Sequence, residues 1–281
     1  MASAVNKLAS QRHPLCQPPH LQLRALPPQR CWTPHLQLRA LPLQPWTPPP
    51  AAARPPAAAL EPLPAEALPS REMDMNNLSR SAACARQEEK AAALQEAQGV
   101  VRLVQVLCYC DPAWSLELLQ RAAPTVERLE LLYAREPHLR AVHAMPRLRR
   151  LRVYCDDDAV HAATPELGAL PPGHSGLRWL HADHLPRATL QCLLQAHGGT
   201  LEELELVVGT PGKPSLPWPI NCSDLHSLLG WCGLRALRRL VLWRGAHKGR
   251  ACREQRAAVR AALPGVQVLC DVCDRVLGEE P

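Results

Sequence analysis

The chain has 281 residues, of which 47% are hydrophobic and 21% charged, and its formal net charge at pH 7 is +6. These proportions are those of a globular protein, and the length allows one or two domains. The sequence holds no run of 18 apolar residues, which argues against a transmembrane helix. The modest basic charge argues against a nucleic-acid-binding surface. We therefore expect neither a membrane nor a nucleic acid as a partner.

The beginning of the chain lacks the features of a secretory signal. Its first 14 residues contain one lysine and no continuous apolar core, whereas such a signal needs an apolar stretch of about 7 to 15 residues. We therefore expect a cytoplasmic protein, with the nucleus as a second compartment. In a reducing compartment the 12 cysteines are expected to be free thiols and not disulfides.

Residues 1–75 are predicted to form a disordered, proline-rich tail. Sixteen of the 30 prolines fall in the first 70 residues, and the segment Pro19–Pro27 is repeated as Pro34–Pro42. Proline lacks the backbone N–H group and clashes with the preceding helical turn. These residues therefore cannot build a regular helix or a central strand.

Residues 76–103 are predicted to form a capping helix that precedes the main domain. Ala, Gln, Glu and Leu dominate this stretch, and all four favour helices. Ser79 is the expected N-cap, because its hydroxyl can accept a hydrogen bond from a free N–H group of the first turn. Helical spacing gives way to alternation near Val104, where we expect the first strand.

Residues 104–275 contain a repeat. Six segments share a pattern of apolar residues at positions 1, 4 and 6, except that the last has Asp271 at position 6. Their first residues lie 22 to 36 positions apart; they are Val126, Leu148, Leu177, Leu201, Leu237 and Val266. Amphipathic stretches with helical spacing lie between them, at residues 114–122, 137–144, 186–197, 223–231 and 250–263. One strand and one helix cannot bury their apolar faces alone, so neighbouring units must share a core. Residues 276–281 are expected to be a short tail.

This alternation of LxxLxL strands and helices resembles leucine-rich repeats of the long, helix-containing kind. Such repeats occur in F-box/LRR substrate receptors and in ribonuclease-inhibitor-like proteins, and the chain is also similar to arthropod LRR proteins without an assigned activity. The resemblance covers residues 100–275. It implies an α/β fold, namely a leucine-rich repeat solenoid with a curved parallel sheet and outer helices, preceded by the disordered tail.

The resemblance leaves two functions open. Leu63–Leu68 is similar to the opening of an F-box, although the residues after it lack the apolar helical pattern of that domain. The first function is a protein–protein interaction module that serves as the substrate-recognition subunit of an SCF-type ubiquitin ligase, with a Skp-type adaptor and a cullin as partners. The alternative is an LRR scaffold or regulatory inhibitor with no ubiquitin link.

The outward positions of the strands are the predicted partner-binding site. If positions 1, 4 and 6 face the core, then positions 2, 3 and 5 lie on the concave face. Aromatic and arginine side chains are common binding anchors, which favours a protein partner there. The alternative is that opposite charges on neighbouring strands only stabilise the register. The candidate residues are Arg149, Arg150, Arg152, Arg178, Trp179, His181, Glu202, Glu203, Glu205, Arg238 and Arg239.

No catalytic motif was found, so we do not expect an enzyme. The sequence lacks a Walker loop, GxGxxG, HExxH and GxSxG, which are common signatures of nucleotide binding, zinc proteases and hydrolases. The segment His181–His184 contains acid/base and metal-binding residue types, but we expect a solvated loop there. The proline-rich segment 210–220 with Trp218 is a candidate binding element, and a solvated loop is the alternative.

No cofactor and no metal are expected. Cys270 and Cys273 are the best metal-binding candidates, with Cys108 and Cys110 as a second pair. A structural zinc ion needs four converging ligands, whereas a solenoid would place these two pairs at its opposite ends. The cysteines are therefore expected to be reduced and to act as small apolar residues in the core.

Overall fold

The computed structural model describes residues 71–155, 165–212, 218–245 and 247–276. The first 70 residues, with the Leu63–Leu68 segment and nearly all of the predicted tail, lie outside the described residues. Most of the short tail predicted at 276–281 and the centre of the 210–220 segment lie outside them too.

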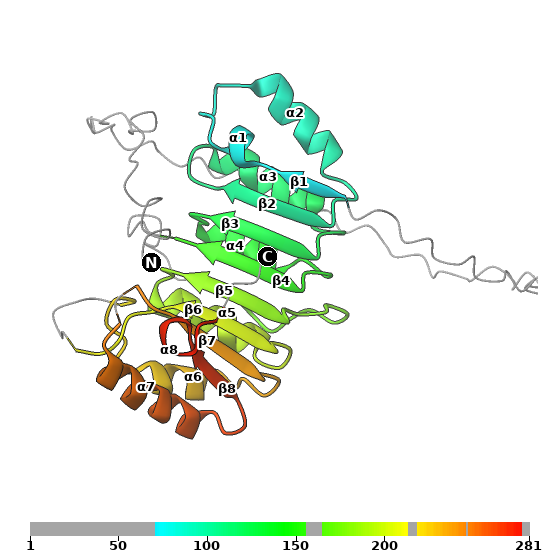
Figure 1. The fold of residues 1–281 in the computed structure, drawn as a ribbon. Coiled ribbons are helices and arrows are strands. Elements are labelled where there is room, and N and C mark those ends of the chain that lie inside the picture. Colours follow the sequence, from blue (N-terminus) through cyan, green and yellow to red (C-terminus); the bar gives the residue numbers. More distant parts are fainter. Residues whose placement is uncertain (1–70, 156–164, 213–217, 246, 277–281) are drawn as a thin grey trace, which may run out of the picture. The chain divides into compact units, whose positions relative to one another are not determined.

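The fold is α/β, with an eight-stranded sheet in which every neighbouring pair of strands is parallel (Figure 1). The strands follow one another across the sheet in sequence order. They are β1 (Glu72–Asp74), β2 (Arg102–Leu107), β3 (Arg128–Leu132), β4 (Arg150–Tyr154), β5 (Trp179–Asp183), β6 (Glu203–Val207), β7 (Arg239–Trp243) and β8 (Gln267–Cys270).

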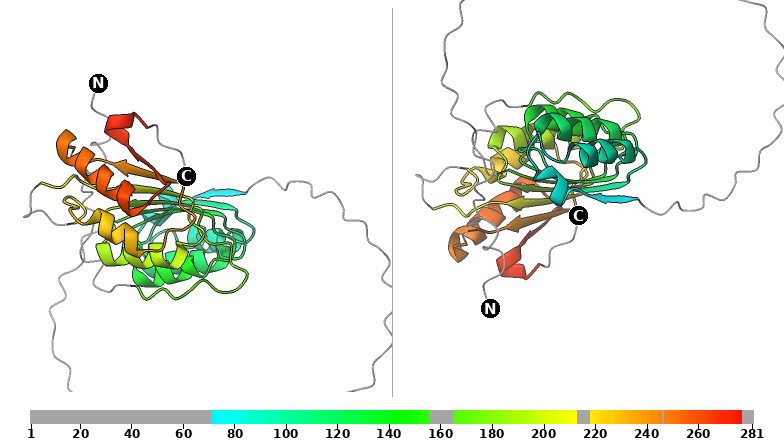
Figure 2. Two further views of the ribbon diagram at one scale, coloured as in Figure 1. Left: turned by 90° about the horizontal axis from the view of Figure 1, so that it is seen from below. Right: turned by 90° about the horizontal axis from the view of Figure 1, so that it is seen from above.

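Helices connect most of the successive strands. They are α1 (Asn76–Ser79), α2 (Gln87–Glu96), α3 (Pro112–Ala122), α4 (Glu136–His143), α5 (Arg187–His197), α6 (Leu225–Trp231), α7 (Gly249–Ala262) and α8 (Asp271–Asp274). Helices α3, α4, α5 and α6 lie along one side of the sheet, and no described helix covers the other side over β3, β4 and β5 (Figures 1 and 2). Between β4 and β5 none of the described residues is helical. None of the described helices combines the length and the apolar character needed to cross a bilayer.

The apolar repeat positions form continuous rows in the core. Position 4 of five consecutive strands is leucine, and the parallel register places these residues side by side; they are Leu129, Leu151, Leu180, Leu204 and Leu240, all of them buried. Position 6 forms a second buried row beneath the helices. Burying one leucine side chain contributes about 2 kcal/mol to stability, so the rows favour this one register over a slipped one.

The strands β2 to β7 begin with the same backbone hydrogen-bond arrangement. The carbonyl of Glu127 accepts the N–H groups of both Arg149 and Arg150, at 2.9 and 3.0 Å. The same two bonds recur at the other strand starts, each time with a single accepting carbonyl from the preceding repeat. The accepting residues are Arg71, Val101, Arg149, Arg178 and Glu202. Two successive N–H groups point toward one neighbouring strand. The side chains at positions 2 and 3 therefore do not point to opposite faces of the sheet, as they would in a regular strand.

The N-terminal part of the domain differs from the predicted capping helix. Residues 72–74 form β1 and pair with β2, although we assigned them to the tail. Two separate helices, α1 and α2, replace one continuous helix. Ser79 is the last residue of α1 and not an N-cap: its hydroxyl donates to the carbonyls of Met75 and Gln105. Helix propensity could not reveal this, because the pairing of β1 with β2 is a tertiary interaction.

The last repeat is shifted by one residue from its predicted register. We expected Leu269 to face the core, but Val268 pairs with Leu240 and Cys270 pairs with Leu242, and both are buried. Leu269 instead pairs with Val241. A shift of one residue moves every side chain of a strand to the other face. The prediction for this strand was therefore wrong.

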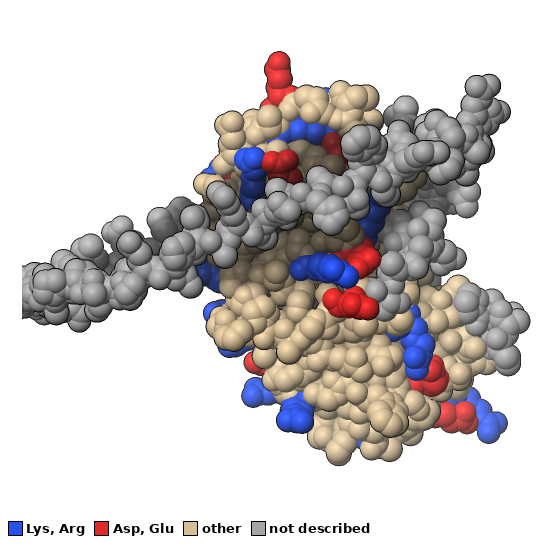
Figure 3. All heavy atoms as spheres, turned by 180° about the vertical axis from the view of Figure 1, so that it is seen from behind, with Lys and Arg blue, Asp and Glu red and all other residues tan. Residues whose placement is uncertain are grey.

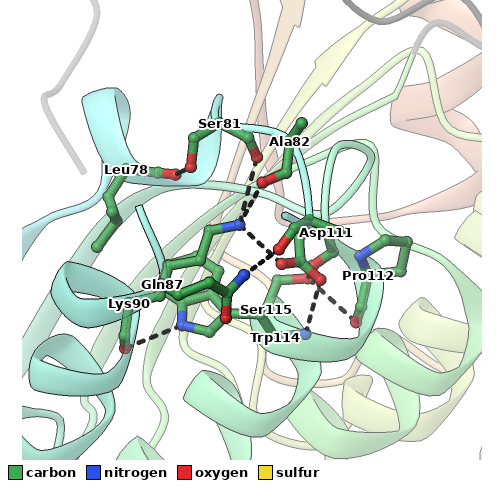
Figure 4. Close-up of polar contacts among 10 residues, drawn as sticks. Leu78, Ser81, Ala82, Gln87, Lys90, Asp111, Pro112, Trp114 and Ser115 are labelled. Carbon is green, nitrogen blue, oxygen red and sulfur yellow. Dashed lines mark hydrogen bonds and ion pairs between the residues drawn. The ribbon is translucent and has the colours of Figure 1, made fainter. Parts of the chain in front are cut away.

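A buried ion pair joins α2 to the start of α3 (Figure 4). Lys90 is 1% exposed, and its ammonium group lies 2.7 Å from Asp111 Oδ2 and 2.8 Å from the carbonyl oxygen of Ala82. Asp111 also caps α3, because its Oδ1 accepts the backbone N–H of Trp114. The indole N–H of Trp114 donates in turn to the carbonyl of Lys90. One carboxylate therefore neutralises a buried cation and satisfies a helix terminus.

The Asp111→Ala variant should be strongly destabilised. It leaves the Lys90 ammonium buried without a counter-ion and removes the cap of α3, so the free energy of unfolding should fall by about 3 to 5 kcal/mol. Urea denaturation measures this change. The control Glu117→Ala breaks an exposed ion pair with Arg121 and should cost less than about 1 kcal/mol.

A double variant tests the physical cause of that loss. Lys90→Met combined with Asp111→Asn removes both charges and keeps a side chain that caps helices. It should regain most of the lost stability. If it is as unstable as Asp111→Ala, the unpaired charge is not the reason for the destabilisation.

A buried histidine lies where α5 approaches the start of β5. The Nδ1 atom of His197 accepts the backbone N–H of Leu177 at 3.2 Å, and its ring meets the ring of His143 edge to face at 5.4 Å. Burial, together with the nearby His143, lowers the pKa of His197 to about 4. The ring is therefore neutral at physiological pH, and a proton on Nδ1 would break the bond to Leu177.

Stability should fall as the pH drops from about 6.5 to about 4. Over this range the unfolded chain binds a proton at His197 and the folded chain does not, which costs on the order of 3 kcal/mol across the interval. Urea denaturation at several pH values measures the slope of the unfolding free energy against pH. The His197→Asn variant should reduce this slope without removing it, because burial also lowers the pKa values of His138 and His143. The His226→Asn variant on the surface of α6 should leave the slope unchanged. An unchanged slope in His197→Asn would contradict the assignment.

Candidate functional site

The strand face is the side of the sheet opposite to α3, α4, α5 and α6 (Figure 1). A hollow of about 290 Å³ lies on this face. It is built from positions 2 and 3 of four consecutive repeats, β3 to β6. The repeated hydrogen-bond arrangement at the strand starts turns both positions outward and forms this row of side chains. The lining residues are Glu127, Arg128, Arg149, Arg150, Arg178, Trp179, Glu202 and Glu203.

The indole of Trp179 occupies the middle of the hollow. It lies between Arg150 and Glu203 in the register of the sheet, and the guanidinium of Arg150 lies over its ring at 4.7 Å. Such a cation–π contact contributes about 0.5 to 1 kcal/mol or more when it is shielded from water. Although it occupies an outward position of its strand, Trp179 is only 4% exposed. Its neighbours in the row are long side chains that cover the ring.

Positive charge gathers on the β2 to β4 side of the hollow. Arg102, Arg128 and Arg150 are direct neighbours in the register, and like charges on adjacent strands disfavour folding. Glu72 pairs with Arg102 at 2.8 Å. By contrast, Arg128 and Arg149 are exposed and form no ion pair within the part of the chain that the structure describes.

Acidic residues border the hollow on the β6 side. Arg178 lies 3.9 Å from Glu202, and Arg239 lies 3.4 Å from Glu203. These pairs are partly exposed and contribute between about 0 and 1 kcal/mol each. The predicted pairing of opposite charges across strands is therefore present at these positions. By contrast, the exposed Arg128 and Arg149 form no ion pair with the described residues, and their guanidinium groups can face a ligand.

A polar cluster lies next to the hollow, in the row formed by position 5. Glu205 is 3% exposed, and its Oε2 accepts hydrogen bonds from Trp243 Nε1 at 2.9 Å and from His181 Nδ1 at 3.0 Å. Because a carboxylate has no proton to donate, Nδ1 of His181 carries one. His181 belongs to β5, which confirms its predicted place on a strand; of the segment His181–His184, for which we expected a solvated loop, only His184 lies outside the strand.

Glu205 is ionised despite its burial. Burial alone would raise the pKa of its carboxyl group, but the hydrogen bonds from His181 and Trp243 and the charge of His181 outweigh burial and lower this pKa. The carboxylate therefore holds two aromatic side chains at the edge of the hollow, and His181 stacks on Trp179 with ring centroids 6.0 Å apart. Glu205 positions the floor of the site and is itself too buried to contact a partner.

The Glu205→Ala variant should be less stable by about 2 to 3 kcal/mol. It leaves the buried N–H groups of His181 and Trp243 without their acceptor, and each such loss is costly. Urea denaturation at pH 7 measures the change. Glu202→Ala is the matched control, because Glu202 is half-exposed and makes only a long ion pair, and it should cost less than about 1 kcal/mol. Equal losses in the two variants would contradict the role of Glu205.

The structure brings part of the predicted site together. Six candidates line the hollow: Arg149, Arg150, Arg178, Trp179, Glu202 and Glu203. The others lie beside it. Arg152, His181 and Glu205 belong to the position 5 row, where Arg152 lies 3.6 Å from Glu130, and Arg238 and Arg239 belong to the β7 repeat. Glu127 and Arg128 were missing from the predicted set, although the same position rule identifies them.

Trp218 has a structural role and not the exposed binding role that we considered. Its indole N–H donates to the carbonyl of Leu185 at 2.8 Å, and its ring packs against the core. Most of the loop before it lies outside the described residues. The hydrogen bond and the packing give this tryptophan a place in the fold.

One group of side chains could hold a metal ion. His247, Cys252, Cys270 and Cys273 each offer a ligand atom, and these atoms lie within 4.8 Å of one another. The sequence analysis considered Cys270 and Cys273 but paired them with Cys108 and Cys110. Those two cysteines follow β2, which is separated from β8 by five strands. The missed partners come from the segment that begins α7.

The opposite face of the molecule differs from the strand face. On the part that Figure 3 leaves uncovered, Lys, Arg, Asp and Glu are scattered singly or in small groups of opposite sign, between wide uncharged areas. The gathering of four arginines around one tryptophan thus distinguishes the strand-face hollow.

Comparison with known proteins identifies no relative. No protein-family model matches the chain, and neither a curated protein nor a solved structure matches it.

Proposed function

We propose that the chain is a protein-recognition module that binds its partner at the strand-face hollow. One observation carries the proposal: Arg128 and Arg149 are exposed, form no ion pair with the described residues, and lie beside a tryptophan on a face that no described helix covers over β3 to β5. Arginine is enriched at the energetic centres of protein interfaces. A purely structural charge pattern would pair these arginines.

The chemistry of the hollow favours an acidic segment of the partner. A volume of about 290 Å³ accommodates one or two side chains rather than a folded element. Guanidinium groups bind carboxylates through two parallel hydrogen bonds. Glu127 on one side and Glu202 and Glu203 on the other would repel a longer acidic stretch, so they would restrict the acidic side chains to the centre of the hollow.

The proposed architecture behind this surface is a leucine-rich repeat solenoid. The sequential order of the parallel strands, the buried leucine rows and the repeated hydrogen-bond arrangement at the starts of β2 to β7 support it. In a solenoid, each repeat contacts mainly its neighbours, and the strand face is the extended surface available to a partner.

The proposed function has two forms. In the first, the module is the substrate-recognition subunit of an SCF-type ubiquitin ligase, which also binds a Skp-type adaptor and a cullin. In the second, it is a scaffold or regulatory inhibitor with no ubiquitin link. Leu63–Leu68, which carries the F-box likeness, lies outside the described residues, so the strand-face hollow supports both forms equally.

Reversing the two unpaired arginine charges should abolish partner binding. The double variant Arg128→Glu and Arg149→Glu converts the basic side of the hollow into an acidic one, and both residues are exposed, so folding should persist. Affinity purification of the tagged full chain with quantitative mass spectrometry compares it with the wild type. We expect a loss of at least about tenfold in the partners recovered, equivalent to 1.4 kcal/mol.

The double variant Arg80→Glu and Arg235→Glu is the matched control. It changes the net charge equally at exposed arginines outside the hollow and should keep the wild-type partners. If the hollow variant stays folded by circular dichroism and recovers the same partners, the proposal is wrong. Recovery of a Skp-type adaptor and a cullin with the wild type would select the ubiquitin-ligase form, and their consistent absence would select the other.

A further inference from the structure

Four metal-binding side chains converge at the C-terminal end of the domain. His247 precedes α7, Cys252 lies in the first turn of α7, Cys270 ends β8, and Cys273 lies in α8. Their ligand atoms are all within 4.8 Å of one another, and His247 Nε2 lies 3.2 Å from Cys273 Sγ. The segment that begins α7, the end of β8 and α8 thus direct one imidazole and three thiols toward one point.

This donor set is one that zinc prefers. In structural zinc sites, four Cys and His ligands surround the ion tetrahedrally, with Zn–S distances of about 2.3 Å and Zn–N distances of about 2.0 Å. Those bond lengths place neighbouring ligand atoms about 3 to 4 Å apart, so small side-chain movements suffice to complete the geometry. The spacing Cys270-x2-Cys273 is also typical of zinc-binding pairs.

We propose that His247, Cys252, Cys270 and Cys273 bind one Zn²⁺ ion in a structural site. Four protein ligands leave no open coordination position for water or a substrate, which separates a structural from a catalytic zinc site. The site is distinct from the strand-face hollow and does not depend on the function proposed for it.

The surroundings fit a metal bound by thiolates. Three thiolates and one Zn²⁺ leave a net charge of −1, and the buried guanidinium of Arg244 lies 3.9 Å from Cys252 Sγ, where it would offset that charge. Arg244 is held in place by the carbonyls of Val208 and Gly209, at 3.2 and 3.1 Å. Such outer groups commonly fix the ligands of a metal site and tune its charge.

The site would also explain how α8 is held. This helix has four residues, none of which is buried, and Val272 is half-exposed. Hydrophobic packing therefore contributes little to its position. Asp274 accepts the backbone N–H of Cys270 and pairs with Arg256 at 2.7 Å, and a zinc ion would add a link from α8 to the start of α7. The zinc ion would then hold the end of the last repeat in place through its bonds to these side chains.

Metal content of the purified full chain tests the proposal. Protein expressed with added zinc and dialysed without a chelator should contain one zinc ion per chain by inductively coupled plasma mass spectrometry. Replacement by Co²⁺ should give the intense visible bands of a tetrahedral thiolate site. Cys273→Ser and His247→Ala should weaken zinc binding by roughly 100-fold or more, since loss of an outer group alone costs 10- to 100-fold. Both residues are at least partly exposed, so these variants should stay folded.

Cys84→Ser is the control, because Cys84 is exposed and lies outside the cluster; it should keep one zinc ion per chain. The proposal is overturned if the folded wild type binds neither Zn²⁺ nor Co²⁺ at micromolar concentration, or if Cys273→Ser and His247→Ala bind zinc as tightly as the wild type. An intact mass lower by two hydrogens, with no metal, would assign the cysteines to a disulfide instead. Circular dichroism of every variant separates loss of metal from loss of fold.

Discussion

The surface of this domain depends on one backbone interaction that recurs at the starts of β2 to β7. A single carbonyl accepts two consecutive N–H groups from the next strand, so positions 2 and 3 both point away from the helices, while position 4 returns to the leucine core. In a regular strand, successive side chains point to opposite faces of the sheet. Without this arrangement, the side chain at position 2 or at position 3 would therefore point into the core. The eight side chains of the hollow lie together because four repeats in succession make the same two bonds.

Much of the fold could be predicted from the spacing of apolar residues. The spacing placed the strands β3 to β7, the helices between them and the outward residues, because leucine rows bury area only in one register. Three features could not be predicted in this way. Strand β1 exists through its pairing with β2, and β8 is shifted because Val268 and Cys270 fill the core as well as Leu269 would. The burial of Trp179 depends on Arg150 and Glu203, which belong to other strands.

The candidate sites show the same division between local and tertiary information. Six residues of the hollow follow from the repeat rule, since equivalent positions of adjacent strands are neighbours in any parallel sheet. The ionised state of Glu205 does not follow from the repeat rule, because it depends on a hydrogen bond from Trp243, which is 38 residues away. The partners of Cys270 and Cys273 could not be identified either: His247 and Cys252 lack a paired-cysteine spacing, and only the packing of α7 against β8 brings them close.

The two kinds of charge in the domain have different roles. Lys90 and Glu205 are buried, and each is neutralised or hydrogen-bonded by several specific groups. Their removal affects folding. Arg128 and Arg149 are exposed and form no ion pair with the described residues, so their charges contribute little to folding and remain accessible to another molecule.

The connection between β4 and β5 has a consequence for the cooperativity of unfolding. Within the described residues it contains no helix. The contacts across it include the register pairs of β4 with β5 and the ring contact of His143 with His197. In a repeat array, cooperativity depends on the interfaces between neighbouring units, so this sheet pairing couples the unfolding of the two sides. The hollow spans the same connection, with Arg128, Arg149 and Arg150 on one side and Trp179, Glu202 and Glu203 on the other. A ligand bound across it would add to that coupling.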